Sequence, residues 1–463
     1  MAYGTRGRAR GNAHQDTVRL TGVRAAGAAR GRRTWLERVA DGAITFPVVV
    51  GVIHLVIVQL AASLGFRYGN SFVTSAPYNQ ECAGNPDFPA CSLEAPLGGL
   101  TQDIVGPFRL WDGLWYKLIA QEGYGFRDAL AAFWPLYPWS MRAVHDLFGI
   151  SYDLAGYLIS NISFVVALIL LYRLISIDFD DVVARRTLWA IALFPTSFFF
   201  SAVYTESLFL MLAVGALLAA RRGNWWVAGL VGLLAALTRS YGVLLLVPFA
   251  VLFLQQFRFN VVRWLPNAIP AALPALGPII FGWRLANIDE SWGKFWAFKD
   301  VQEQWARRSE MPWDTLRWAF SNSPHGEELG VRAGADWSWI GDLFDNLGWD
   351  TLTSGVFRER VGNSDTLELL ATLLFLGLAV IGLKMLPLYQ SAFLIPGLVI
   401  PLFQPSGVHI LMSMPRFGLT LFPLFVVMAL LLRQRRIVLP VAAVSTVLLV
   451  LLTMQFANWY WVS

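Results

Sequence analysis

The sequence predicts an all-α protein that crosses a membrane many times. Of its 463 residues, 56% are hydrophobic and only 14% are charged, whereas soluble domains carry about 25% charged residues. The apolar residues are gathered in runs of about 20, the length that an α-helix needs to cross a bilayer. With a positive mean hydropathy of +0.52, these observations indicate a polytopic bundle of about eleven (roughly ten to twelve) spans.

The first span is expected near residues 44–64. Further spans are expected near residues 152–176, 187–201, 204–221, 224–238, 241–257, 264–286, 364–383, 387–404, 416–432 and 437–456. If the N-terminus lies in the cytoplasm, alternation places "DFDDVVARR", "RRGNWW", "QQFRFNVVR", Lys384 and "RQRR" there too. Because Lys and Arg in short loops set topology, this agreement favours a cytoplasmic N-terminus and an external C-terminus.

The basic N-terminal segment, residues 1–42, is expected to be a disordered cytoplasmic tail, followed by one membrane domain over residues 43–463. Nine arginines fall in the first 40 residues, and the net charge of the chain is +5. Basic residues beside a span are the ordinary positive-inside signal, so we expect no nucleic-acid partner for "TRGRARG". No cleavage site of a signal peptide is recognisable, so we expect the first span to be retained.

Two segments are too polar to cross a bilayer, and the topology places both outside the cytoplasm: residues 65–130 and the tryptophan-rich residues 287–363. The first contains the two cysteines, Cys82 and Cys91, for which a disulfide is favoured over two free thiols. Residues 111–123 have the spacing of an amphipathic helix at the membrane interface. "AAFWPLYPWSMRAVHDLFG", just beyond, predicts an interfacial or re-entrant helix.

Charged side chains near the span ends are the candidates for chemistry. Glu206 in "YTES" and Arg239 in "LTRSYG" interrupt apolar runs, where ionisable residues are costly and therefore functional by default. A salt bridge that only joins two helices is the alternative for this pair. Asp112 in "WDG" and Arg416 in "MPRFG" are expected on the same face. An N-cap among interfacial tryptophans is the alternative for Asp112.

Four sequence blocks, taken together, resemble a known family. They are "RLWDGLWYKLIAQEGY", "FWPLYP", "LFPTSFFFSAVYTESLFLML" and "GLLAALTRSYGVLL". In this order they resemble the glycosylphosphatidylinositol mannosyltransferase 2 (PIG-V-like) family of the GT-C superfamily of membrane glycosyltransferases. The resemblance covers roughly residues 100 to 255, and the "MPRFGLTLFPLF" segment more loosely.

The resemblance implies a GT-C-like bundle that moves mannose from a polyprenyl-phosphate carrier to an acceptor hydroxyl outside the cytoplasm, with inversion. It also implies that Asp112 is the general base that takes the acceptor proton. The leaving lipid phosphate needs a cationic clamp, for which Arg239 and Arg416 are the candidates. Glu206 is a candidate for binding sugar hydroxyls or orienting Arg239. The remaining candidates for shaping the pocket or stacking on a sugar are Tyr204, Trp111, Trp134 and Tyr137.

The acceptor stays open between a glycolipid, a glycan and a protein. The long external loops lack an Asn-x-Ser/Thr sequon, and the only such triplet lies inside a span at residues 161–163. Together with the arginine- and alanine-rich tail, this favours a bacterial plasma membrane, or the endoplasmic reticulum if the chain is eukaryotic.

A metal or other cofactor is not expected. "DFD" at residues 178–180 resembles a metal-binding Asp-x-Asp, but a solvated loop or a helix cap in a cytoplasmic loop is favoured. No His/Cys cluster has metal-ligand spacing. The competing functions are a GT-C enzyme for another lipid-phosphate sugar, a lipid-linked-sugar flippase or transporter, and a noncatalytic scaffold. A transporter would place its charges near the bilayer midplane.

Overall fold

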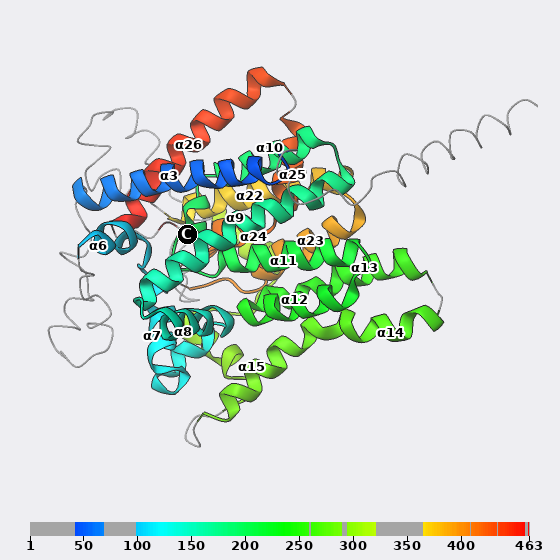
Figure 1. The fold of residues 1–463 in the computed structure, drawn as a ribbon, viewed down its shortest axis with the longest axis horizontal. Helices are drawn as coiled ribbons and strands as arrows, with labels where there is room; N and C mark the ends of the chain where they lie inside the picture. Colours follow the sequence, from blue (N-terminus) through cyan, green and yellow to red (C-terminus); the bar gives the residue numbers. More distant parts are fainter. Residues whose placement is uncertain are drawn as a thin grey trace, which may run out of the picture. The chain divides into compact units, whose positions relative to one another are not determined.

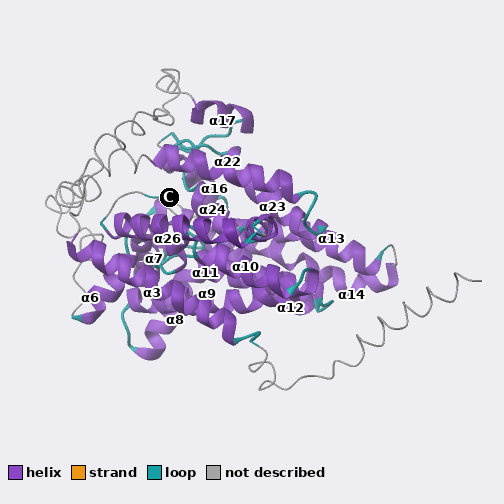
Figure 2. Ribbon diagram, turned by 90° about the horizontal axis from the view of Figure 1, so that it is seen from above, coloured by secondary structure: helices purple, strands orange, loops and turns teal. Residues whose placement is uncertain are grey.

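The computed structural model describes residues 42–68, 99–258, 261–288, 294–320, 364–407, 409–432, 434–458 and 462. Within these ranges every regular element is helical, apart from an isolated bridge between Arg307 and Ser406 (Figure 2). The all-α prediction is therefore confirmed for this part of the chain. Residues 1–46 and 47–463 form separate units, and the second is described here. The cysteine pair and almost all of the basic tail lie outside the described residues.

The helices keep the labels of Figure 1. The α-helices are α3 (Thr45–Tyr68), α6 (Leu100–Val105), α7 (Asp112–Glu122), α8 (Leu136–Phe148), α9 (Tyr152–Asp178), α10 (Asp181–Ala192), α11 (Glu206–Arg221), α12 (Trp225–Thr238), α13 (Leu246–Phe257), α14 (Val261–Ala272), α15 (Leu276–Ala286), α16 (Ala297–Asp300), α17 (Pro312–Phe320), α22 (Ser364–Gly382), α23 (Leu388–Leu402), α24 (Met414–Thr420), α25 (Pro423–Leu431) and α26 (Arg435–Ala457). The 3-10 helices are η2 (Gly106–Phe108), η3 (Tyr124–Phe126), η4 (Asp128–Ala132), η5 (Ser197–Phe200), η6 (Ser240–Leu245), η7 (Leu273–Ala275) and η8 (Val301–Trp305).

The described residues contain six helices that are long and apolar enough to cross a membrane, or seven if one bent pair is a single span. The six are Thr45–Tyr68, Tyr152–Asp178, Ser240–Phe257, Trp264–Ala286, Asp365–Gly382 and Arg436–Ala457, and each coincides with a predicted span. The protein is thus a multi-pass membrane protein. The predicted number of about eleven spans is not confirmed, because α12 and α23 are apolar but short and α11 has only 16 residues.

Two predicted spans are broken. The segment predicted as 416–432 consists of α24 and α25, which meet at an angle of 82°. Pro423 has no backbone N–H and opens α25, so the first helix does not continue into the second. The segment predicted as 187–201 ends its α-helix at Ala192 and continues as the 3-10 helix η5. Neither segment is one continuous helix, so these two predicted spans are not confirmed, and hydropathy alone does not reveal the breaks.

Burial separates helices of the core from helices at the surface. α11 lies between α9 and α12 (Figure 1) and is buried along most of its length. In contrast, only 17% of the apolar window of α26 is buried, and Leu439, Val444 and Val447 are exposed. A water-soluble protein rarely exposes so continuous an apolar surface, so this face suits contact with lipid.

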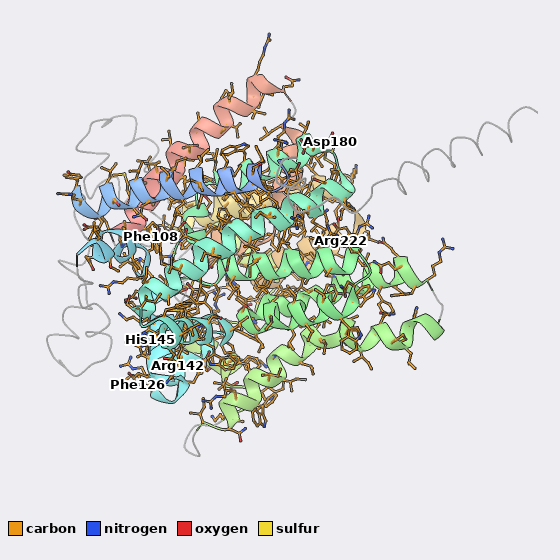
Figure 3. The ribbon with its side chains drawn as sticks, viewed as in Figure 1. Phe108, Phe126, Arg142, His145, Asp180 and Arg222 are labelled. Atoms are coloured by element: carbon orange, nitrogen blue, oxygen red, sulfur yellow. The ribbon has the colours of Figure 1, made fainter. Side chains whose placement is uncertain are left out.

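The arginine-rich loops that were predicted on one side of the membrane meet at one end of the helices. Arg221 Nη2 lies 2.9 Å from Asp178 Oδ1, and Asp178 Oδ2 accepts hydrogen bonds from Tyr389 and Gln390. Asp180, also in "DFD", accepts a 2.8 Å bond from Val183 N and caps α10, as the helix-cap interpretation predicts. In Figure 3, Asp180 lies toward one end of the helices and Phe108 toward the other.

The first loop, beyond α3, is helical where it is described. α7 confirms the helix predicted over residues 111–123, and α8 confirms a helix in "AAFWPLYPWSMRAVHDLFG". A buried ion pair fixes α7 to α9: Lys117 Nζ lies 2.8 Å from Asp153 Oδ2, and Arg109 Nη1 lies 3.5 Å from the same oxygen. The side chain of Asp153 is 1% exposed, so its charge depends on these two cations. The interfacial position of α7 and α8 stays a prediction.

We expect Asp153→Asn to lower stability by about 3–5 kcal/mol, because it breaks a buried ion pair by removing the carboxylate that Lys117 and Arg109 share. The matched control is Asp146→Asn, which removes an ion pair with Arg142 whose side chains are 54% and 63% exposed. That change should cost less than about 1 kcal/mol. The melting temperatures of the purified proteins in detergent measure both. Equal melting temperatures for the two variants would contradict the anchoring of α7 by Asp153.

Candidate active site

Asp112 is the first residue of α7, and its side chain is directed away from its own helix. The N-cap position belongs to Trp111, and no side chain caps this end of α7. Instead, Oδ2 of Asp112 lies 2.6 Å from Nη1 of Arg416. The alternative in which Asp112 only caps its helix is therefore wrong, because the carboxylate is engaged by an arginine 304 residues further along the chain.

Glu206, the first residue of α11, receives two arginines on one carboxylate oxygen. Arg239 Nη1 lies 2.7 Å from Oε1 of Glu206, and Arg416 Nε lies 2.9 Å from the same oxygen. The Glu206–Arg239 salt bridge thus forms, but it does not stand alone. Asp112, Arg416, Glu206 and Arg239 make one chain of contacts, called here the four-charge network, which joins α7, α24, α11 and the end of α12.

The members of the four-charge network differ in how far they are exposed. The side chain of Glu206 is 0% exposed, Arg416 7%, Arg239 11% and Asp112 19%. Within the described residues, Glu206 Oε2 has no hydrogen-bond partner, and Arg416 binds Oδ2 of Asp112 and not Oδ1. Glu206 is therefore the buried anchor of the network, and Asp112 is the member that a substrate reaches most easily. Both acids begin helices, where the N-terminal partial charge favours a carboxylate.

Tyr204 ties the start of α7 to the segment before α11. Its hydroxyl accepts a 3.1 Å hydrogen bond from Asp112 N and donates a 3.2 Å bond to Leu110 O. The guanidinium of Arg416 lies over its ring, 4.7 Å from the centroid. Tyr204 therefore fixes both the backbone of Asp112 and the cation that binds its side chain.

Tyr116, one helical turn after Asp112, lies close to both carboxylates. Burial, followed by the charges of Asp112 and Glu206, raises the pKa of its phenol above the ordinary value. Its hydroxyl lies 3.5 Å from Oγ1 of Thr205. Tyr116 therefore stays a neutral hydroxyl at physiological pH and is not suited to act as a base.

The other predicted pocket residues lie around the network or apart from it. Trp111 directly precedes Asp112. Tyr137 is fully buried, and its hydroxyl donates to Gly156 O at 2.9 Å, which is a packing role behind Tyr116. Trp134 packs on Phe281, with ring centroids 5.1 Å apart, instead of on the charged residues. The roles of these side chains toward a sugar stay predictions.

The loop after α15, for which the sequence offered no function, lies over the first loop. Trp305 contacts Phe133 with ring centroids 5.9 Å apart and Trp115 with centroids 6.4 Å apart. Two residues further on, the guanidinium of Arg307 lies 6.0 Å from the centroid of Phe417, the neighbour of Arg416. Sequence reasoning missed Arg307, because an arginine in a polar loop is ordinary. The tryptophans around it were the only signal.

Strained backbone surrounds the same place. Within the described residues, four residues other than glycine have a positive φ, and three of them are Trp111 at 55°, Ala306 at 51° and Ser413 at 68°. Trp111 precedes Asp112, Ala306 precedes Arg307, and Ser413 begins the turn that leads to Arg416. Such conformations cost about 1–3 kcal/mol each and concentrate at functional sites. For Ser413, a 3.1 Å bond from its N to Oε1 of the buried Glu368 offsets part of the cost.

No group of three or more His, Cys, Asp or Glu side chains in the described part of the chain is arranged to hold a metal ion. In the four-charge network, each of the two carboxylates is already engaged by a guanidinium group. The expectation that the chemistry needs no metal or other cofactor stays a prediction.

The fold and the site define a class: a multi-pass membrane protein that gathers two carboxylates and two guanidinium groups at one end of its helices. Residues 40–266 match the family model Mannosyltransferase (PIG-V). The matched range includes Asp112, Tyr204, Glu206 and Arg239, whereas Arg416 lies beyond it. The family recognised from the four sequence blocks is thus confirmed.

Two relatives are similar to the chain over part of its length. The GPI alpha-1,6-mannosyltransferase 2 of Mus musculus is 31% identical over 165 residues, which cover 32% of this chain and 33% of the mouse protein. The Rattus norvegicus protein of the same name is 31% identical over 164 residues, which cover 33% of this chain and 31% of the rat protein. The chain therefore spans about a third of the length of the curated relatives it matches.

We expect Glu206→Gln to destabilise the protein by about 3–5 kcal/mol, because two buried guanidinium groups then face each other without their shared counter-charge. Glu303→Gln, at an exposed position of η8, is the control and should leave stability within about 0.5 kcal/mol. Melting temperatures in detergent report the difference. If the Glu206→Gln protein has the same melting temperature as the wild type, the carboxylate of Glu206 is not needed for stability.

Proposed function

We propose that the chain is an integral-membrane mannosyltransferase that moves mannose from a polyprenyl-phosphate donor to an acceptor hydroxyl, with Asp112 as the general base. One observation carries the proposal: the PIG-V family region supplies three members of a buried, charged network whose most exposed group is Asp112. The acceptor is a glycolipid, a glycan or a protein, and the names of the two relatives favour a glycolipid.

The reaction is a single displacement at C1 of the sugar. The acceptor oxygen forms a bond to C1 as the bond between C1 and the phosphate oxygen breaks, so the configuration inverts. The acceptor proton passes to Asp112, and the electron pair of the broken bond stays on the lipid phosphate. Oδ1 of Asp112 suits the proton transfer, because Oδ2 is the oxygen held by Arg416.

Arg239 and Arg416 are proposed to contact the phosphate through N–H groups that the carboxylates do not use. A guanidinium has five N–H donors. Arg416 donates from Nε to Glu206 and from Nη1 to Asp112, and Arg239 donates from Nη1 to Glu206. The free donors of both groups therefore suit the phosphate oxygens, whose charge grows as the sugar leaves. In this scheme Glu206 orients the two arginines.

We place the site outside the cytoplasm. The network lies at the N-terminal end of α11, and Arg221 and the Asp178 cluster lie at its other end. Basic residues in short loops favour the cytoplasm, so the network belongs on the opposite side. Charges at the ends of helices, away from their middles, also favour transfer chemistry over transport through the membrane.

Asp112→Asn should reduce mannose transfer by about 100-fold or more, because the amide takes no proton from the acceptor. The assay supplies membranes with radiolabelled polyprenyl-phosphate mannose and counts label in the acceptor fraction. Asp103→Asn, an exposed position of α6, is the control. Full transfer by an Asp112→Asn protein that keeps its melting temperature would end the proposal.

A panel of donors tests the sugar. Polyprenyl phosphates that carry mannose, glucose or galactose are offered to the same membranes at equal concentration. We expect mannose to be transferred at least about ten-fold faster than the others. Faster transfer of another sugar would show that the protein is a GT-C enzyme for that sugar. If no sugar is transferred from any of the donors, a flippase is favoured.

A further inference from the structure

A segment of the second loop is held beside the four-charge network by backbone hydrogen bonds. Arg308 N donates to Pro405 O at 3.0 Å, Glu310 N donates to Phe403 O at 3.0 Å, and Gly407 N donates to Ala306 O at 2.8 Å. These bonds run on both sides of Arg307, which forms the isolated bridge to Ser406. The position of Arg307 is therefore set by the main chain.

The side chain of Arg307 lies against the residue that follows Arg416. Its guanidinium is 6.0 Å from the centroid of Phe417, and the guanidinium of Arg239 is 5.5 Å from the same ring. Nη1 of Arg307 donates to Gln404 O at 3.2 Å. The guanidinium groups of Arg239 and Arg307 thus share the ring of Phe417, and Arg416 directly precedes this residue in the chain.

Arg307 differs from the other two in forming no ion pair in the part of the chain that the structure describes. Arg239 and Arg416 each contact a carboxylate, whereas within the described residues Arg307 forms no ion pair. Burial lowers the pKa of Arg307, and the like charge of Arg416 acts in the same direction, whereas Tyr241, Glu368 and Asp112 act against it. Of the three guanidinium groups, only that of Arg307 contacts no carboxylate within the described residues. A partly buried cation without such a contact is costly, and an anion from outside the chain would offset that cost.

We propose that Arg307 binds the phosphate group of the lipid-linked donor and holds it after the sugar has left. This inference rests on the proposed function, since it concerns the donor of that reaction. The donor is a phosphodiester with one negative charge, and the leaving polyprenyl phosphate is a monoester with up to about two at neutral pH. A cation that no carboxylate neutralises is suited to the added charge.

The experiment measures equilibrium binding of radiolabelled polyprenyl phosphate, without a sugar, to the purified protein in nanodiscs. Arg307→Gln removes the cation. Arg308→Gln is the matched control, since Arg308 is the exposed neighbour in the same hydrogen-bonded segment. Competition with unlabelled polyprenol tests whether the lipid tail alone accounts for binding, and competition with inorganic phosphate tests whether free phosphate does.

We expect Arg307→Gln to weaken binding about ten-fold or more and Arg308→Gln to leave it within about two-fold, because a charged hydrogen-bonded contact is lost in one variant only. If the two variants bind alike, the assignment of Arg307 is wrong, while the proposed function stands on the Asp112→Asn result. If wild-type protein binds polyprenol as tightly as polyprenyl phosphate, the donor class fails, and this inference fails with it.

A third variant guards against misfolding. If Arg307→Gln melts lower than wild type, Arg307→Lys replaces it, because lysine keeps the charge and loses the planar fork. We expect Arg307→Lys to bind about five-fold more weakly than wild type, within the range of one hydrogen bond to a charged group. Wild-type affinity in that variant would overturn a guanidinium contact with the phosphate.

Discussion

The buried carboxylate of Glu206, shared by two guanidinium groups, is the interaction on which the site depends. The charge of a fully buried acid is stabilised by its counter-charges, and Arg239 and Arg416 both reach Oε1 of Glu206. Arg416 then brings Asp112 to the network. Four elements that are far apart in the sequence are fixed to one another at their ends, and the same contacts that stabilise the bundle give Asp112 its position.

The helical fold follows from the sequence where one physical rule decides, and fails to follow where two rules compete. Runs such as residues 152–176 are apolar for the length of a bilayer, and a long helix is the only way to satisfy their backbone in lipid. The segment 416–432 is as apolar but contains Pro423, where the helix breaks by 82°. α11 is apolar on all sides because protein surrounds it. Hydropathy alone does not separate burial in protein from burial in lipid.

The site was predictable to the extent that its residues are unusual in their surroundings. Glu206 and Arg239 interrupt apolar runs, so the cost of an isolated charge predicts that they meet a partner. They meet each other, as the salt-bridge alternative predicts. The second arginine on Glu206, and the contact between Asp112 and Arg416 across 304 residues, do not follow from spacing. Arg307 escaped prediction for the opposite reason. In a polar loop an arginine is unremarkable until the main chain is seen to hold it beside Phe417.

Under the proposed reaction, the charges of the network and the phosphate change together. Before transfer, two carboxylates balance the guanidinium groups of Arg239 and Arg416. When Asp112 takes the acceptor proton it becomes neutral, and Arg416 loses one of its two counter-charges. The phosphate gains negative charge in that same step. The network therefore becomes more positive only as the transition state forms, and this difference lowers the barrier without tightening the binding of the intact donor. The constant charge of Arg307, in contrast, acts on the donor phosphate both before and after transfer.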